Sequence, residues 1–255
     1  MRTYVSIDGF NLYYGALKGT PFKWLDVKRL VTHLVPQNHQ INKIKYFTAR
    51  VSGAADRDAP RKQAIYLRAL RTIPEVEIHF GNFLAKTIWR PLLNLPVANE
   101  TISTPPPVVL PAGNLPVTGN PNAQTLPVGS YPARGQQRMH IVARPLADAV
   151  ITEVHSMEEK GSDVNLAAHL LNDAWKKLFD AAVVISNDTD LTTPIRMVTT
   201  ERALPVFVVC PGRWTMSPKL IAVASYVRHI RGAMLRASQF PDPIPGTTIS
   251  KPIGW

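Results

Sequence analysis

The chain has 255 residues, of which 45% are hydrophobic, and a formal net charge of +11 at pH 7. That apolar content can fill a full core, and the single cysteine, Cys210, allows no internal disulfide. No Cys/His cluster has zinc-site spacing, and no apolar stretch approaches the roughly 20 residues that span a bilayer. With no basic-then-apolar leader at its N-terminus, the sequence predicts a soluble, cytoplasmic protein without a membrane partner.

The excess of positive charge favours a polyanionic partner. Lys and Arg side chains that neutralise phosphates release counterions and gain salt-sensitive affinity. Solubility alone is the alternative explanation for the charge.

Strand-like and helix-like segments alternate along the chain. Strands are expected at about 3–8, 42–50, 76–80, 181–186 and 205–210, with an extended segment at 82–88 and strand candidates within 139–156. Helices are expected at about 11–18, 26–34, 60–71, 163–176, 190–200 and 217–224. This alternation predicts an α/β fold with a mainly parallel central sheet covered on both faces. Ser162 is the expected N-cap of the 163–176 helix.

We expect residues 1–255 to form a single domain with two proline-rich segments. The first is an insert at about 91–132, which holds ten of the 23 prolines and lacks the backbone donors of a sheet interior or helix. The second is a tail at about 238–255. Phe240 and Trp255 favour a tail that docks on the domain, and a disordered tail is the alternative.

Acidic residues follow two of the predicted strands. Asp8 ends the first strand, and Asp188 and Asp190 follow the strand at 181–186. Asp163 opens the helix that precedes this second strand. Because ligands bind at the carboxyl ends of parallel strands, these four carboxylates are expected to converge on one sheet edge. Their mutual repulsion would be relieved by a cation, although helix capping and the helix dipole are alternative roles for each.

Hard carboxylate oxygens are the ligands that Mg²⁺ and Mn²⁺ prefer, so the pattern predicts a divalent-metal site. A metal held in this way can activate water and polarise a phosphoryl group. Substrate-binding roles are predicted for four nearby residues: Asn11, Lys160, Asn187 and Tyr13. The two amides would hydrogen-bond a phosphate or the metal waters, the lysine would neutralise a phosphate oxygen, and the tyrosine would stack a base. Helical packing explains the tyrosine equally well, and a solvated surface lysine is an equal alternative for Lys160.

Three segments carry a family resemblance. Ile7-Asp8-Gly9-Phe10-Asn11-Leu12, Lys160-Gly161-Ser162-Asp163-Val164 and Ser186-Asn187-Asp188-Thr189-Asp190-Leu191 resemble the three signature segments of the NYN domain. That family belongs to the PIN-like nuclease superfamily, and the similarity is greatest to its bacterial LabA/DUF88-type branch. One departure is Asn187, where many members carry Gly.

The resemblance implies a PIN-like, Rossmann-like α/β/α sandwich and a metal-dependent ribonuclease that uses Mg²⁺ or Mn²⁺. It maps the catalytic and metal-binding acids onto Asp8, Asp163, Asp188 and Asp190. The implied partner is RNA, single-stranded or structured, with DNA also compatible, and the family often forms homodimers. A noncatalytic RNA-binding or adaptor protein with this fold is the alternative. A phosphatase or receiver-like phosphoacceptor is disfavoured, because no Asp stands two residues after Asp8.

Overall fold

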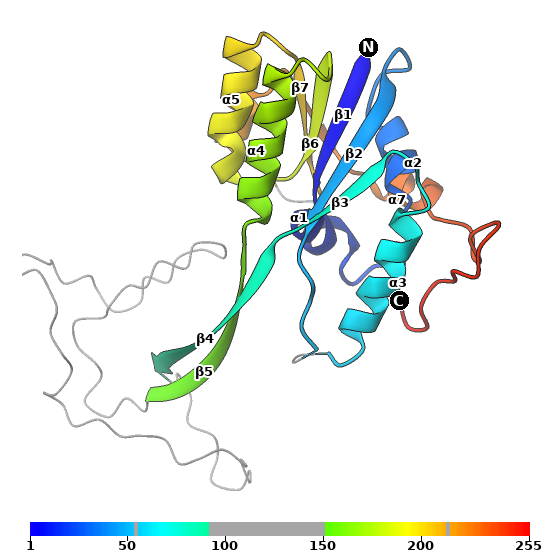
Figure 1. Cartoon of the computed structure of the whole chain (residues 1–255), viewed down its shortest axis with the longest axis vertical. Helices are drawn as coiled ribbons and strands as arrows, with labels where there is room; N and C mark the ends of the chain where they lie inside the picture. The colour runs from blue at the N-terminus through cyan, green and yellow to red at the C-terminus, as the bar shows by residue number, and fades with distance from the viewer. Residues whose placement is uncertain (54–55, 92–150, 213–214) are drawn as a thin grey trace, which may run out of the picture. The chain divides into compact units, whose positions relative to one another are not determined.

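The computed structural model describes residues 1–53, 56–91, 151–212 and 215–255 (Figure 1). Its main element is a six-stranded sheet in the order β3-β2-β1-β6-β7-β8, in which every neighbouring pair is parallel. The strands are β1 (Arg2–Asp8), β2 (Gln40–Thr48), β3 (Val76–Phe80), β6 (Ala181–Ile185), β7 (Val206–Cys210) and β8 (Tyr226–His229). The predicted α/β class with a mainly parallel sheet is confirmed, and the strand order is that of a doubly wound fold.

Helices cover both faces of this sheet (Figure 1). The elements packed between and beside the strands are α1 (Gly9–Leu12), the π-helical turn η1 (Tyr13–Leu17), α2 (Val27–Thr32), α3 (Ala59–Leu70), α4 (Ser162–Trp175), the 3₁₀ turn η2 (Thr189–Leu191), α5 (Thr192–Glu201), α6 (Pro218–Val223) and α7 (Gly232–Ala237). Helices α4, α5 and α6 pack in one hydrophobic cluster, and α2, α3 and α7 pack in the other. Side chains alternate between the clusters along β1, β6 and β7, so the centre of the sheet is buried on both sides.

The strongest strand signals came from continuous apolar runs. All five residues of β6 and all five of β7 are buried, as expected for central strands of a parallel sheet. Strand β8 was not predicted, and all four of its residues are exposed. An edge strand without a buried face has no hydrophobic periodicity by which it can be recognised.

Two local predictions need correction. The expected helix at 11–18 is a four-residue α-helix followed by the π-helical turn η1. The expected N-cap, Ser162, is already the first residue of α4, and Gly161 occupies the cap position with a φ of 96°. Glycine adopts this left-handed conformation without a Cβ clash, which lets the chain turn sharply from the preceding strand into the helix.

The chain divides into two compact units, one made of residues 1–84 and 158–255 and the other of residues 85–157. The first unit contains the six-stranded sheet. Strands β4 (Asn82–Pro91) and β5 (Ile151–Lys160) pair with each other in a separate two-stranded sheet. Apart from Pro91, the predicted insert at 91–132 lies outside the described residues. Within the described ranges, every helix is too short or too polar to serve as a membrane span.

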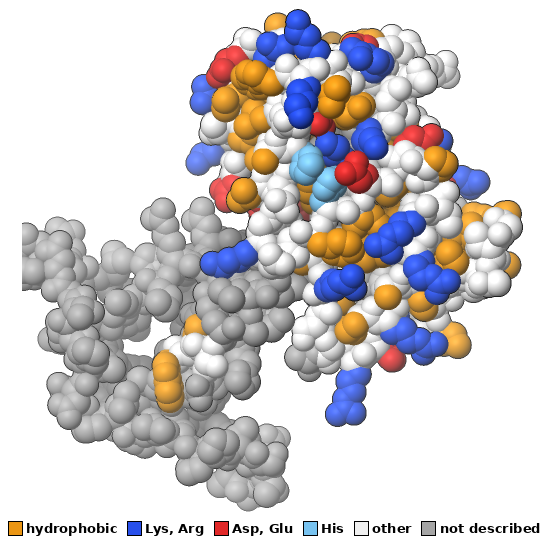
Figure 2. All heavy atoms as spheres, in the orientation of Figure 1, with side chains coloured by type: hydrophobic (Ala, Val, Ile, Leu, Met, Phe, Trp, Pro, Cys, Tyr) orange, Lys and Arg blue, Asp and Glu red, His pale blue; other side chains and the backbone are white. Residues whose placement is uncertain are grey.

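A cluster of ionisable side chains joins β2 and β3 to α4. Histidine side chains lie beside acidic and basic ones on the face seen in Figure 2. The Lys45 ammonium donates to Asp173 Oδ2 at 2.6 Å and to His169 Nδ1 at 3.1 Å, and the side chains of Lys45 and Asp173 are 10% and 6% exposed. Because an ammonium only donates, His169 accepts at Nδ1 and is held as the neutral Nε2–H tautomer. The ring of His79 lies 4.2 Å from the His169 ring, and its Nε2 lies 3.2 Å from Glu77 Oε1.

This cluster predicts a loss of stability in mild acid. Burial lowers the pKa of both His79 and His169 below the ordinary value of 6.5, and the Lys45 charge lowers that of His169 further. The unfolded chain therefore binds these protons more readily than the folded protein, so the free energy of unfolding falls as pH falls through 6.5. Urea unfolding at pH 7.5, 6.5 and 5.5 measures this. A His79→Gln/His169→Gln variant should show a flatter dependence than a His33→Gln control, and an equal slope in both would contradict the assignment.

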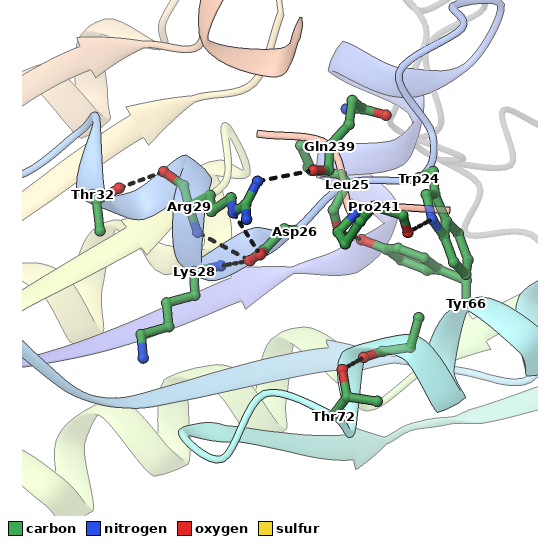
Figure 3. A network of polar contacts seen from close by, with 11 residues as sticks. Trp24, Leu25, Asp26, Lys28, Arg29, Thr32, Tyr66, Thr72, Gln239 and Pro241 are labelled. Carbon is green, nitrogen blue, oxygen red and sulfur yellow. Dashed lines mark hydrogen bonds and ion pairs between the residues drawn. The ribbon is translucent and has the colours of Figure 1, made fainter. Parts of the chain in front are cut away.

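The C-terminal tail packs on α2, α3 and their neighbours, as Figure 3 shows. The Phe240 ring lies 5.6 Å from the Trp24 ring, and Trp24 Nε1 donates to the Pro241 carbonyl oxygen at 3.2 Å. The hydroxyl of Tyr66 donates to the Leu25 carbonyl oxygen at 2.9 Å, beside the same indole. Docking of the tail, predicted from its aromatic residues, is confirmed.

Candidate active site

The candidate site lies at the carboxyl edge of the sheet, between β1 and β6. These neighbouring strands flank the point where the strand order reverses, which is where ligands bind in open α/β sheets. Asp8 is the last residue of β1, and Ser186 directly follows β6. The sequence positions differ by 178, and the parallel pairing of the two strands brings them together.

The Asp8 carboxylate is buried and held by hydrogen bonds from the segments that follow β1 and β6. It caps α1 by accepting from the backbone N–H of Asn11 at 2.9 Å. Its other oxygen accepts from the Ser186 hydroxyl at 3.0 Å, and that hydroxyl accepts from the backbone N–H of Asp188 at 3.1 Å. A chain of hydrogen bonds thus fixes the orientation of the carboxylate.

Burial raises the pKa of the Asp8 carboxyl above its ordinary value, and the charge on Asp188 adds to the rise. The hydrogen bonds from the Asn11 N–H and the Ser186 hydroxyl oppose it. Beside Asp8, burial also raises the pKa of the Tyr46 phenol, and the Asp8 charge contributes. Perturbed carboxyl groups at a sheet edge are candidates for proton transfer.

A second set of contacts ties the loops around the site together. The Asn11 side-chain oxygen accepts from the backbone N–H of Asn187 at 3.1 Å. The Asn187 side chain donates to the Thr215 carbonyl oxygen at 3.2 Å and accepts from the Ser217 N–H at 3.0 Å. Both amides therefore position the loops after β1, β6 and β7.

The other predicted site residues differ in burial and in the contacts that they make. Asp188 is half-buried and caps η2 by accepting from the N–H of Asp190, which is itself exposed. Asp163 lies in the first turn of α4, and Lys160 is the exposed last residue of β5. Tyr13 is half-buried and packs edge-on against Tyr14 with ring centroids 5.3 Å apart. Asp188 thus has a capping role, and Asp163 lies where the helix dipole favours a negative charge.

The turn after β1 does not fit the pyrophosphate of a nucleotide cofactor. Such a group binds where the first helix presents free N–H groups, but here the Asp8 carboxylate already accepts the Asn11 N–H. Gly9 has a packing role instead, because a Cβ there would lie 2.8 Å from the Phe47 carbonyl oxygen and from the Tyr46 ring. This glycine permits close packing of α1 on β2.

Sequence reasoning did not assign roles to two residues of the site. Ser186 links the two aspartates, and its position directly after a buried strand was a usable signal. Tyr46 lies within β2, where it is indistinguishable by pattern from an ordinary core aromatic.

Comparison with known proteins gives one informative relative. No family model matches the chain. The chain is 29% identical to 6-hydroxy-3-succinoylpyridine 3-monooxygenase from Pseudomonas putida, over 100% of this chain and 75% of that protein. A solved structure of a protein of unknown function from Vibrio parahaemolyticus is 14% identical, with a TM-score of 0.45, over 91% of this chain and 93% of that one.

The prediction of a metal-dependent ribonuclease is therefore wrong, whereas RNA as a binding partner stays a prediction. The relative is an enzyme named for oxidation and not for phosphodiester cleavage. Among the described residues, no group of three or more His, Cys, Asp or Glu could hold a metal ion. Asp8 instead accepts the Asn11 N–H and the Ser186 hydroxyl, and Asp188 accepts the N–H of Asp190. The NYN resemblance stays a prediction.

Proposed function

We propose that this protein is an enzyme that oxidises a hydroxylated aromatic compound at the Asp8 site. The observation that carries the proposal is the similarity to a monooxygenase over the whole chain, which includes the ends of β1 and β6. The buried carboxyl at the edge of the sheet supplies a chemical group suited to this role.

Asp8 would accept the proton of the substrate's ring hydroxyl. Its raised pKa makes its carboxylate a stronger base than an exposed aspartate, which favours proton transfer near neutral pH. Loss of the hydroxyl proton makes the ring richer in electrons and more reactive toward oxygen. Ser186 and the Asn11 N–H would keep the carboxylate oriented during this transfer.

Monooxygenation also needs two electrons and two protons, because one atom of O₂ enters the substrate and the other leaves as water. A reduced nicotinamide or flavin supplies those electrons in many such enzymes. Because the Asp8 carboxylate already occupies the Asn11 N–H at the turn after β1, no residue at this turn is assigned to a redox cofactor.

Oxygen uptake and product mass test the proposal. The protein is mixed with 6-hydroxy-3-succinoylpyridine, NADH and FAD, and substrate-dependent O₂ uptake and a product of altered mass are expected. Asp8→Asn should lower turnover by about 10²-fold or more, because the proton acceptor is lost. An Asp58→Asn control changes an exposed carboxylate whose side chain does not cap α3, and should leave turnover unchanged.

Two outcomes would contradict different parts of the proposal. Absence of substrate-dependent oxidation by the wild type argues against the function. Equal turnover by the wild type and Asp8→Asn argues against the site, provided that both proteins unfold cooperatively. Removing the carboxylate should not lower the unfolding midpoint at pH 7, because its raised pKa means that the charged form destabilises the fold.

A further inference from the structure

Helix α3 and its C-cap residue carry an exposed row of arginines, here named the arginine stripe: Arg61, Arg68 and, at the cap, Arg71, with Ala64 between the first two. At 3.6 residues per turn, positions 61, 64, 68 and 71 fall on one side of the helix, and the row is about 15 Å long at 1.5 Å per residue. All four residues are exposed. Basic side chains are spread over the face on which α3 lies (Figure 2).

The stripe does not serve the stability of the fold. Within the described part of the chain, its three arginines make no ion pair, whereas the adjacent Lys62 lies 3.7 Å from Asp56. The opposite side of α3 anchors the helix through Tyr66, Leu67, Ala69 and Leu70, which are buried. Like charges one turn apart, as at Arg68 and Arg71, destabilise a helix slightly. A partner with negative charge would offset this repulsion.

We propose that the arginine stripe binds an acidic α-helix of a partner protein. A helix lying along α3 presents carboxylates at i, i+7 and i+10 with the same axial spacing as the three arginines. The small side chain of Ala64 at the centre allows the two helix axes to approach to about 8 to 10 Å. The planar guanidinium groups can then bind carboxylates through paired hydrogen bonds.

Two other occupants fit this surface less well. Single-stranded nucleic acid binds through aromatic stacking platforms as well as charge, and the one aromatic residue of α3, Tyr66, is buried. A second copy would need a helix with three carboxylates in a row, but the acidic residues of the described helices are Asp163 and Asp173 of α4, Asp190 of η2 and Glu201 of α5, so none carries three. Charge complementarity therefore points to a different, acidic chain.

Fluorescence anisotropy with a labelled peptide tests the proposal. The probe is an alanine-based helical peptide with Glu at i, i+7 and i+10, compared with its Lys counterpart, at low and high salt. The Glu peptide alone should bind, and more weakly at high salt. The triple variant R61Q/R68Q/R71Q should lose at least tenfold in affinity, and Ala64→Gln should also weaken binding by obstructing the close approach.

The matched control is the triple variant K176Q/R196Q/K219Q, which removes the same charge at three other exposed positions and should change affinity less than twofold. Equal losses in the two triple variants would mean that net charge alone drives binding and would overturn the proposal. Tighter, stripe-dependent binding of a single-stranded oligonucleotide would overturn it in favour of nucleic acid. Absence of Glu-peptide binding would overturn it as well.

Discussion

Replacing Lys45 with alanine is expected to destabilise the protein by about 3 to 5 kcal/mol, because the Asp173 carboxylate would remain buried without its charged partner. The side chains of Lys45 and Asp173 are 10% and 6% exposed, and Lys45 Nζ lies 2.6 Å from Asp173 Oδ2. Water therefore cannot easily replace the lysine. The free energy of unfolding is measured by urea denaturation at pH 7.5. A loss below about 1 kcal/mol would contradict the buried character of the pair.

Two further variants separate the ion pair from general damage. In the double variant Lys45→Met/Asp173→Leu, no buried charge is left, and stability should return close to that of the wild type. Lys43→Ala removes one member of an ion pair whose side chains are 38% and 45% exposed, and should cost less than about 1 kcal/mol.

Phe240→Ala is expected to destabilise the protein by about 3 to 5 kcal/mol, because it leaves a cavity beside Trp24 that the surrounding backbone cannot fill. The tail is anchored here by the hydrogen bond from the Phe240 N–H to the Trp24 carbonyl oxygen at 2.9 Å and by the aromatic contact. Urea unfolding followed by tryptophan fluorescence measures the loss. A control, Ile253→Ala, changes a side chain that is 98% exposed and should leave stability unchanged. If both variants match the wild type, the tail does not contribute to the fold.

The central strands could be predicted from sequence because strands buried on both faces consist of consecutive apolar residues. Every residue of Ala181–Ile185 and Val206–Cys210 is buried, and the apolar runs mark both strands. The edge strand Tyr226–His229 is exposed at all four positions, so its sequence shows no comparable apolar run. The π-helical turn at Tyr13–Leu17 has the same apolar composition as an α-helix, so composition alone could not distinguish them.

At the candidate site, the location was predictable and the chemistry was not. Asp8 and Asp188 were placed at one sheet edge from their positions after strands, and their charges do interact in the structure. Whether a carboxylate binds a metal or accepts backbone N–H groups depends on local geometry that the sequence pattern does not contain. The Lys45–Asp173 pair shows the same limit, since its members lie 128 positions apart.

The place of β1 in the sheet affects how this protein is made. Its neighbour β2 follows within the first 48 residues, but β6, its other neighbour, begins only at Ala181. At about 5 to 20 residues per second of synthesis, the 178 positions between Asp8 and Ser186 correspond to roughly 10 to 35 s during which one edge of β1 has no partner strand. Open strand edges pair readily with other chains, so the ribosome-bound nascent protein passes through a period in which chaperone protection matters most.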